Sequence, residues 1–132
     1  MDTPGFRISI GVDIVEVPRI ERLVRKHERV QERLFTRPEI DYCRARGKCY
    51  EHMAARFAAK EAVLKALGTG LVTGMRWTDV EVVNEEGGRP HVKLAGAVAA
   101  FAERLGVQQL EVSLSHTSGL ALAQALALRT QD

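Results

Sequence analysis

The chain of 132 residues has few aromatic residues, few cysteines and no long uninterrupted apolar run. Phe, Trp and Tyr make up only 5% of it, which argues against a surface that stacks the bases of single-stranded nucleic acid. Its apolar stretches are too short to span a bilayer. The start of the sequence also lacks the basic and apolar regions of a secretory signal. We therefore expect a cytoplasmic protein without a membrane span.

Cys43 and Cys49 are the only cysteines. Two thiols are too few for a disulfide framework or for a structural zinc site, which needs four ligands. A reducing compartment would also keep them reduced. We expect both to be free thiols.

The composition, with 45% hydrophobic and 27% charged residues, is typical of a globular protein. The length predicts a single domain over residues 1–132 with little core to spare, so oligomerisation is open. The net charge is only +2, but it is unevenly distributed, which favours a partner that meets one patch.

Residues 7–17 alternate between apolar and other side chains, which predicts a half-buried strand. Its apolar face would be Ile8, Ile10, Val12 and Ile14. Asp13 would face away from that side. Pro18 is expected to open a helix in which apolar residues recur at helical spacing: Ile20, Leu23, Val24, Val30 and Leu34. A basic stripe lies beside them, formed by Arg19, Arg22, Lys26, Arg29 and Arg33.

The rest of the chain predicts a mixture of helices and strands. Thr36 and Glu39 have capping-box spacing and would start a short helix that reaches about Arg46. An alanine-rich helix over residues 52–67, ended by Gly68, is expected to be central and buried. Strands follow at 79–84 and 91–94, a helix at 95–105, and strands at 109–116 and 120–128. This order predicts an α+β fold with a mainly antiparallel sheet.

Residues 56–70 (RFAAKEAVLKALGTG) place one carboxylate, Glu61, among three cations and end in a glycine-flanked threonine. Such a segment suits a ligand that brings phosphate groups and a divalent ion. Asp13 could simply cap a helix or form a salt bridge, and Glu61 could pair with Lys65 four residues on. However, Glu61 lies in a helix so apolar that it should be partly buried and need a partner. A magnesium ion shared with Asp13 would supply one.

His116 ends a predicted strand, where a histidine is more often a residue at the edge of the core than a catalyst. The nearby Ser113 and Ser115 lack the surrounding glycines of a nucleophile elbow. The Gly68-Thr69-Gly70 turn matches neither the P-loop nor the Rossmann fingerprint.

Three segments, 10–20 (IGVDIVEVPRI), 56–70 and 112–116 (VSLSH), resemble in order the signature segments of bacterial holo-acyl carrier protein synthases. The resemblance implies a single-domain 4'-phosphopantetheinyl transferase of fatty acid biosynthesis. Such enzymes use magnesium to move the phosphopantetheine arm of coenzyme A onto a serine of apo-acyl carrier protein. Adenosine 3',5'-bisphosphate is released.

The resemblance also implies roles for individual residues. Asp13 and Glu61 would hold the magnesium, and Lys65 would reach the pyrophosphate; these are the implied catalytic residues. The residues implied to bind the nucleotide are Arg56, Gly68, Thr69, Gly70, Pro90 and His116. Those implied to meet the carrier protein are Arg19, Arg22, Lys26 and Arg29. The family forms trimers with active sites between subunits.

Arg56 and Lys65 are nine positions apart at about 100° each, so they point to nearly opposite sides of their helix. One ligand could touch both only by wrapping the helix or with help from a second subunit. The base that accepts the serine proton is either Glu61 or a metal-bound water that it organises. Two other functions remain open: a basic, non-catalytic module that binds nucleotides or nucleic acid, and a coenzyme A-dependent acyltransferase. Neither would require magnesium.

Overall fold

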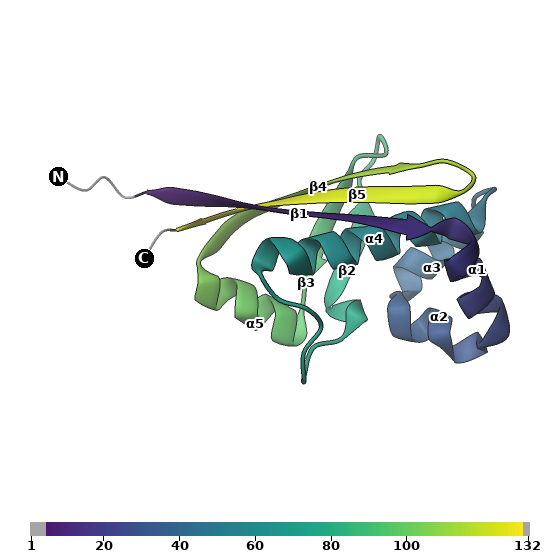
Figure 1. Ribbon diagram of the computed structural model, residues 1–132, viewed down its shortest axis with the longest axis horizontal. Helices are drawn as coiled ribbons and strands as arrows, with labels where there is room; N and C mark the ends of the chain where they lie inside the picture. Colours follow the sequence, from purple (N-terminus) through teal and green to yellow (C-terminus); the bar gives the residue numbers. More distant parts are fainter. Residues whose placement is uncertain (1–4, 131–132) are drawn as a thin grey trace.

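Two long strands from opposite ends of the sequence pair along their whole length in the computed structural model, which describes residues 5–130. β1 (Phe6–Glu16) runs antiparallel to β5 (Leu120–Thr130), with Phe6 opposite Thr130. β4 (Val107–His116) pairs with the other edge of β5, which gives the strand order β1-β5-β4. Figure 1 shows these three strands as one long, narrow layer.

The alanine-rich helix α4 (Cys49–Leu67) packs against one face of this sheet (Figure 1). Small residues let the two elements approach closely, since the alternate β5 residues Ala121, Ala123, Ala125 and Ala127 are fully buried. On β1, a Cβ atom added at Gly11 would overlap the backbone carbonyl oxygen of Ala62. The expectation of a central, buried helix is confirmed.

The expected buried face of β1 is wrong. Ile8, Ile10 and Ile14 are about 60% exposed, while Gly11 and Val15 are buried. The reason is that α4 covers the face that carries the small residues, and the large apolar side chains take the other side. Together with large residues of β5 they form what we call the apolar sheet face: Ile8, Ile10, Val12, Ile14, Leu120, Leu122 and Leu126.

The helix expected to begin at Pro18 and continue to Leu34 is in fact two helices. α1 (Val17–Lys26) ends and α2 (Glu28–Leu34) begins around His27, whose backbone is extended at φ −133° and ψ 100°. The His27 N–H still donates to the carbonyl oxygen of Leu23 and closes the first helix. The break lets each piece turn its own apolar residues inward, and the periodicity alone does not reveal it.

The predicted capping box is confirmed at the start of α3 (Arg37–Arg44). The Glu39 N–H donates to the hydroxyl of Thr36, and the Thr36 N–H donates to Oε1 of Glu39 at 2.8 Å. The helix ends at Arg44, earlier than predicted, and α4 begins only a few residues later.

The second half of the chain follows the predicted order, but its strands form two separate antiparallel sheets. A 3₁₀ turn (Trp77–Asp79) leads into the hairpin of β2 (Val80–Asn84) and β3 (Pro90–Leu94). α5 (Gly96–Leu105) ends at Gly106, whose φ of 77° favours glycine. The α+β class is confirmed. None of the helices within residues 5–130 is long and apolar enough to cross a membrane.

Candidate functional site

The packing of β1 on α4 brings Asp13, Glu61 and Lys65 to one place. Lys65 Nζ lies 3.0 Å from Asp13 Oδ1 and donates to the carbonyl oxygen of Val12 at 3.0 Å. Glu61 lies one turn earlier on the same helix and is half-buried, as expected. Burial raises the pKa of Glu61, and the negative charge of Asp13 raises it further, while Lys65 and Arg19 oppose the change.

Of the two simpler alternatives, the structure shows the salt bridge of Asp13, which it forms with Lys65. Among the ion pairs of residues 5–130, Lys65 pairs with Asp13 across the fold, and the local pair with Glu61 is not formed. The negative charge of Asp13 raises the pKa of Glu61, and a cation between the two carboxylates would relieve this repulsion.

A cation at this point would have a small set of protein ligands. Within the described part of the chain, no group of three or more His, Cys, Asp or Glu side chains could hold a metal ion. Magnesium commonly binds one or two carboxylates and completes its shell with water and substrate phosphates. The oxygen donors of Asp13 and Glu61 therefore fit magnesium and a phosphate ligand together.

A second cluster lies around a pocket of about 190 Å³ between α3, α4, the β2–β3 hairpin and β4. Arg56, Pro90 and His116, which the sequence predicts to bind a nucleotide, all line it. The other predicted residues of that set, Gly68, Thr69 and Gly70, do not. They follow the opposite end of α4, where Gly68 caps the helix at φ 79°.

Arg56 is held almost out of solvent in this pocket, at 3% exposure. Its Nη2 donates to Oδ1 of Asn84, and its guanidinium lies 3.9 Å from the centre of the Tyr42 ring. Its Nε–H is buried without a hydrogen-bond acceptor in the described part of the chain. A buried, unpaired donor on a cation is costly and is expected to meet a polar ligand.

His116 is fixed in the same pocket by a carboxylate. Its Nδ1 lies 2.9 Å from Oε1 of Glu51, and its ring centre lies 4.9 Å from that of His52. Tyr42, His52 and Asn84 also line the pocket and were not predicted from the sequence. Only the regular spacing of His52 and Arg56, one turn apart on α4, gave any signal; the other two come from elements whose packing the sequence does not specify.

The predicted basic stripe is interrupted. Arg19, Arg22 and Lys26 line a shallow hollow of about 420 Å³ on α1, together with Leu23 and His27. Arg29 lies beyond the break, on α2. A partner that docks on α1 would therefore meet three of the predicted cations on one surface.

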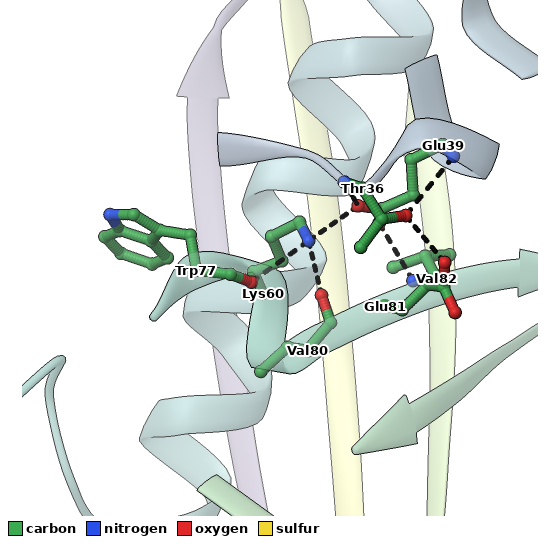
Figure 2. A network of polar contacts seen from close by, with 7 residues as sticks. All are labelled: Thr36, Glu39, Lys60, Trp77, Val80, Glu81 and Val82. Atoms are coloured by element: carbon green, nitrogen blue, oxygen red, sulfur yellow. Dashed lines mark hydrogen bonds and ion pairs between the residues drawn. The ribbon is translucent and has the colours of Figure 1, made fainter. Parts of the chain in front are cut away.

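Lys60 does not belong to the cationic site suggested by residues 56–70. Its side chain is fully buried and points between α3 and β2, as Figure 2 shows. Its Nζ donates to Glu39 Oε1 at 2.8 Å and to the carbonyl oxygens of Trp77 and Val80. Glu39 accepts in addition from the Val82 N–H at 2.9 Å. The ion pair thus ties three elements together.

Burial lowers the pKa of Lys60, and the neighbouring charge of Glu39 opposes this. The three cations of segment 56–70 therefore lie in three different surroundings. Lys65 neighbours the acidic pair, Arg56 lies in the pocket, and Lys60 supports the core. As expected, Arg56 and Lys65 contact different elements on opposite sides of α4.

The chain is similar in sequence to proteins of one known family. The family model of the 4'-phosphopantetheinyl transferase superfamily matches residues 9–125. The chain is 47% identical over 119 residues to the holo-[acyl-carrier-protein] synthase of Moorella thermoacetica, covering 90% of this chain and 92% of that protein.

The chain is also similar in fold to solved structures of that family. The ACPS–CoA complex from Chronobacterium ammoniagenes superposes with a TM-score of 0.84 at 30% identity, covering 96% of this chain and 99% of that one. The holo-(acyl-carrier-protein) synthase of Bacillus anthracis, solved with CoA (3',5'-ADP), gives 0.77 at 31% identity, covering 95% and 99%.

Proposed function

The chain belongs to the 4'-phosphopantetheinyl transferase superfamily as a holo-[acyl-carrier-protein] synthase, and from this we propose how its own residues perform the transfer. The phosphopantetheine arm of coenzyme A passes to a serine of apo-acyl carrier protein, in cytoplasmic fatty acid biosynthesis, with magnesium held by Asp13 and Glu61. The observation that carries the proposal is the packing of α4 on β1, which brings Glu61 and Lys65 beside Asp13, with Lys65 Nζ 3.0 Å from Asp13 Oδ1. The negative charge of Asp13 raises the pKa of Glu61, and a shared cation would relieve this.

In the proposed reaction the serine oxygen forms a bond to the phosphorus that carries the pantetheine arm. The bond between this phosphorus and the bridging oxygen of the pyrophosphate breaks, and adenosine 3',5'-bisphosphate leaves with the electron pair. Magnesium, when bound, would neutralise the charge of the pyrophosphate. Lys65, more than half exposed beside Asp13, adds a positive charge for the same group. Glu61 accepts the serine proton, either directly or through a water molecule that it orients.

The nucleotide part of coenzyme A is proposed to contact Arg56, His116 and Pro90, whose pocket supplies a buried, unpaired donor. Gly68, Thr69 and Gly70 lie away from this pocket within one protomer. They can contact the same nucleotide only if a site is shared between subunits. The same holds for Arg56 and Lys65, on opposite sides of α4.

We propose a homotrimer with active sites between its subunits. Its support is the apolar sheet face, in which seven large apolar side chains are 36–62% exposed. A contiguous apolar surface of this kind is typical of an interface. A neighbouring copy that covers it would stand against β1, the strand that carries Asp13.

The carrier protein is proposed to dock on α1 at Arg19, Arg22 and Lys26, with Arg29 beyond the break at the margin. Acyl carrier proteins are typically acidic. The cations would therefore speed encounter, in a manner that salt weakens.

The test is the intact mass of apo-acyl carrier protein after incubation with this protein, coenzyme A and magnesium. We expect a gain of one phosphopantetheine and no gain when magnesium is chelated. Glu61→Gln should lower the rate by about 10²-fold or more, because it removes both a metal ligand and the proton acceptor. Glu103→Gln, an exposed glutamate on α5, is the matched control and should retain full activity.

The alternatives give different masses. An acyltransferase would add only the acyl group of an acyl-coenzyme A, and a binding module would add nothing. Either result, or undiminished activity of Glu61→Gln, would contradict the proposal.

A further inference from the structure

Two histidines from different elements face one another in the pocket of Arg56. His52 of α4 and His116 of β4 have ring centres 4.9 Å apart, in an edge-to-face arrangement. Both line the pocket. The edge of the Tyr42 ring from α3 packs on His52 at 5.9 Å. Of the two, only His116 was expected from the sequence to have a role.

The ionisable groups around His52 are two arginines, a second histidine and one glutamate. His116 approaches from β4, Arg56 lies one turn along α4, and Arg46 comes from the segment that joins α3 to α4. Glu51 is the one acidic group among these, and its Oε1 is already paired with His116. Burial lowers the pKa of His52, His116, Arg56 and Arg46 lower it further, and Glu51 opposes them. His52 is therefore neutral at neutral pH.

An anion bound in the pocket would raise the pKa of His52, because its negative charge favours the protonated ring. A phosphate monoester carries about −1.5 to −2 charges at neutral pH. Coenzyme A has such a group, the 3'-phosphate, separate from its pyrophosphate. Lys65 and the acidic pair lie on the opposite side of α4 and suit the pyrophosphate. The monoester is thus the phosphate that matches the buried Arg56 donor.

We propose that His52 is a further coenzyme A-binding residue: it takes up a proton from solvent when the phosphate monoester enters the pocket, and becomes its cationic partner beside Arg56 and His116. This inference rests on the proposed function, in which the pocket holds part of the nucleotide. His52 would be one more residue that contacts the nucleotide, and its protonation would accompany binding.

The direction of the pH dependence follows. A group that gains a proton on binding makes affinity rise as pH falls, and each unit of pKa increase in the complex is worth up to tenfold in affinity. The ligand's own phosphate, with a pKa of about 6, acts with the opposite sign because it binds best as the dianion. Comparing variants with the same ligand isolates the part that belongs to His52.

The experiment is calorimetric titration of the protein with coenzyme A at about pH 7 in two buffers of different ionisation enthalpy, which reports the protons taken up on binding. We expect His52→Gln to take up fewer protons than the unmodified protein and to bind up to about tenfold more weakly at pH 6. His52→Phe, which keeps a ring to pack on Tyr42, should show the same loss. His91→Gln is the control, since it removes a histidine that does not line the pocket, and it should leave proton uptake unchanged.

A second ligand identifies the phosphate. With 3'-dephospho-coenzyme A, the unmodified protein and His52→Gln should take up equal numbers of protons. Equal proton uptake with coenzyme A itself would overturn the proposed role of His52. A failure of the proposed function looks different: the unmodified protein would not bind coenzyme A, or Arg56→Met would bind it equally well.

Discussion

Lys60 and Glu61 are neighbours in the sequence, yet their charges have different surroundings. Glu61 lies half-buried near Asp13, where its charge is available to a ligand. Lys60 is fully buried and is satisfied by Glu39 and two backbone carbonyl groups. The sequence predicts that Glu61 needs a partner, because a carboxylate in an apolar helix does. It does not predict the partner of Lys60, because Glu39 already had a local explanation as part of a capping box.

Removing only one member of this buried pair should be strongly destabilising. Lys60→Met leaves the Glu39 carboxylate buried without its countercharge, and we expect the free energy of unfolding to fall by about 3–5 kcal/mol. Adding Glu39→Gln removes the stranded charge and should recover part of the loss. Denaturant titration measures both variants.

The matched control is Arg25→Met. Arg25 and Glu21 form an exposed pair four residues apart on α1, at 2.9 Å. Its loss should change stability by no more than about 0.5 kcal/mol. A comparably small effect of Lys60→Met would contradict the importance assigned to the buried pair.

At the scale of helices and strands, local signals predicted the elements well where a short-range interaction defines a boundary. The Thr36 capping box and the glycines that end α4 and α5 are examples. The break at His27 was missed because no proline or glycine marks it, and it follows from packing on distant elements. The close contact of β1 with α4 was also not predicted, although it requires the glycine at position 11.

The contact between Gly11 of β1 and Ala62 of α4 leaves no room for a larger side chain. Gly11→Ala would place a methyl group into the backbone of α4 at Ala62, so the helix or the strand must shift. We expect a loss of at least about 1–3 kcal/mol of stability, the usual cost of overpacking. Thermal and denaturant unfolding provide the measurement.

Gly119→Ala serves as the comparison, because a Cβ at Gly119 would meet nothing within 4 Å and its φ is not positive. This change should leave stability within about 0.5 kcal/mol. If the two variants unfold alike, the contact between β1 and α4 is looser than described.

At the scale of the whole molecule, the sequence did not predict which face of β1 packs against the core of the chain. The alternation of residues 7–17 correctly predicted a strand, but the apolar side was taken as the core side. Periodicity divides a strand into two faces without saying which one meets the core of the same chain. Here the small side chains lie inside and the large ones form the apolar sheet face.

The proposed trimer makes this face testable. Ile10→Glu introduces a charge at its centre, where Ile10 is 59% exposed, and should convert the assembly into monomers. Light scattering combined with size-exclusion chromatography reports the mass. Transfer activity should fall with it if the sites lie between subunits.

Val72→Glu controls for the added charge. Val72 is also large, apolar and 52% exposed, but it lies outside the sheet. It should leave the assembly intact. A protein that is monomeric before any substitution, or a trimer that survives Ile10→Glu, would contradict the proposed interface.

The pairing of β1 with β5 also bears on how the protein is made. β5 is the middle strand of its sheet, and its partner β1 lies more than a hundred positions earlier in the sequence. Contacts between such distant segments are slow to form, because a long loop must close first. On the ribosome, β1 can already pack on α4, but the paired edge of β1 and the part of α4 that β5 covers must stay uncovered until β5 has emerged. This interval is when the nascent chain is most exposed to aggregation or to capture by a chaperone.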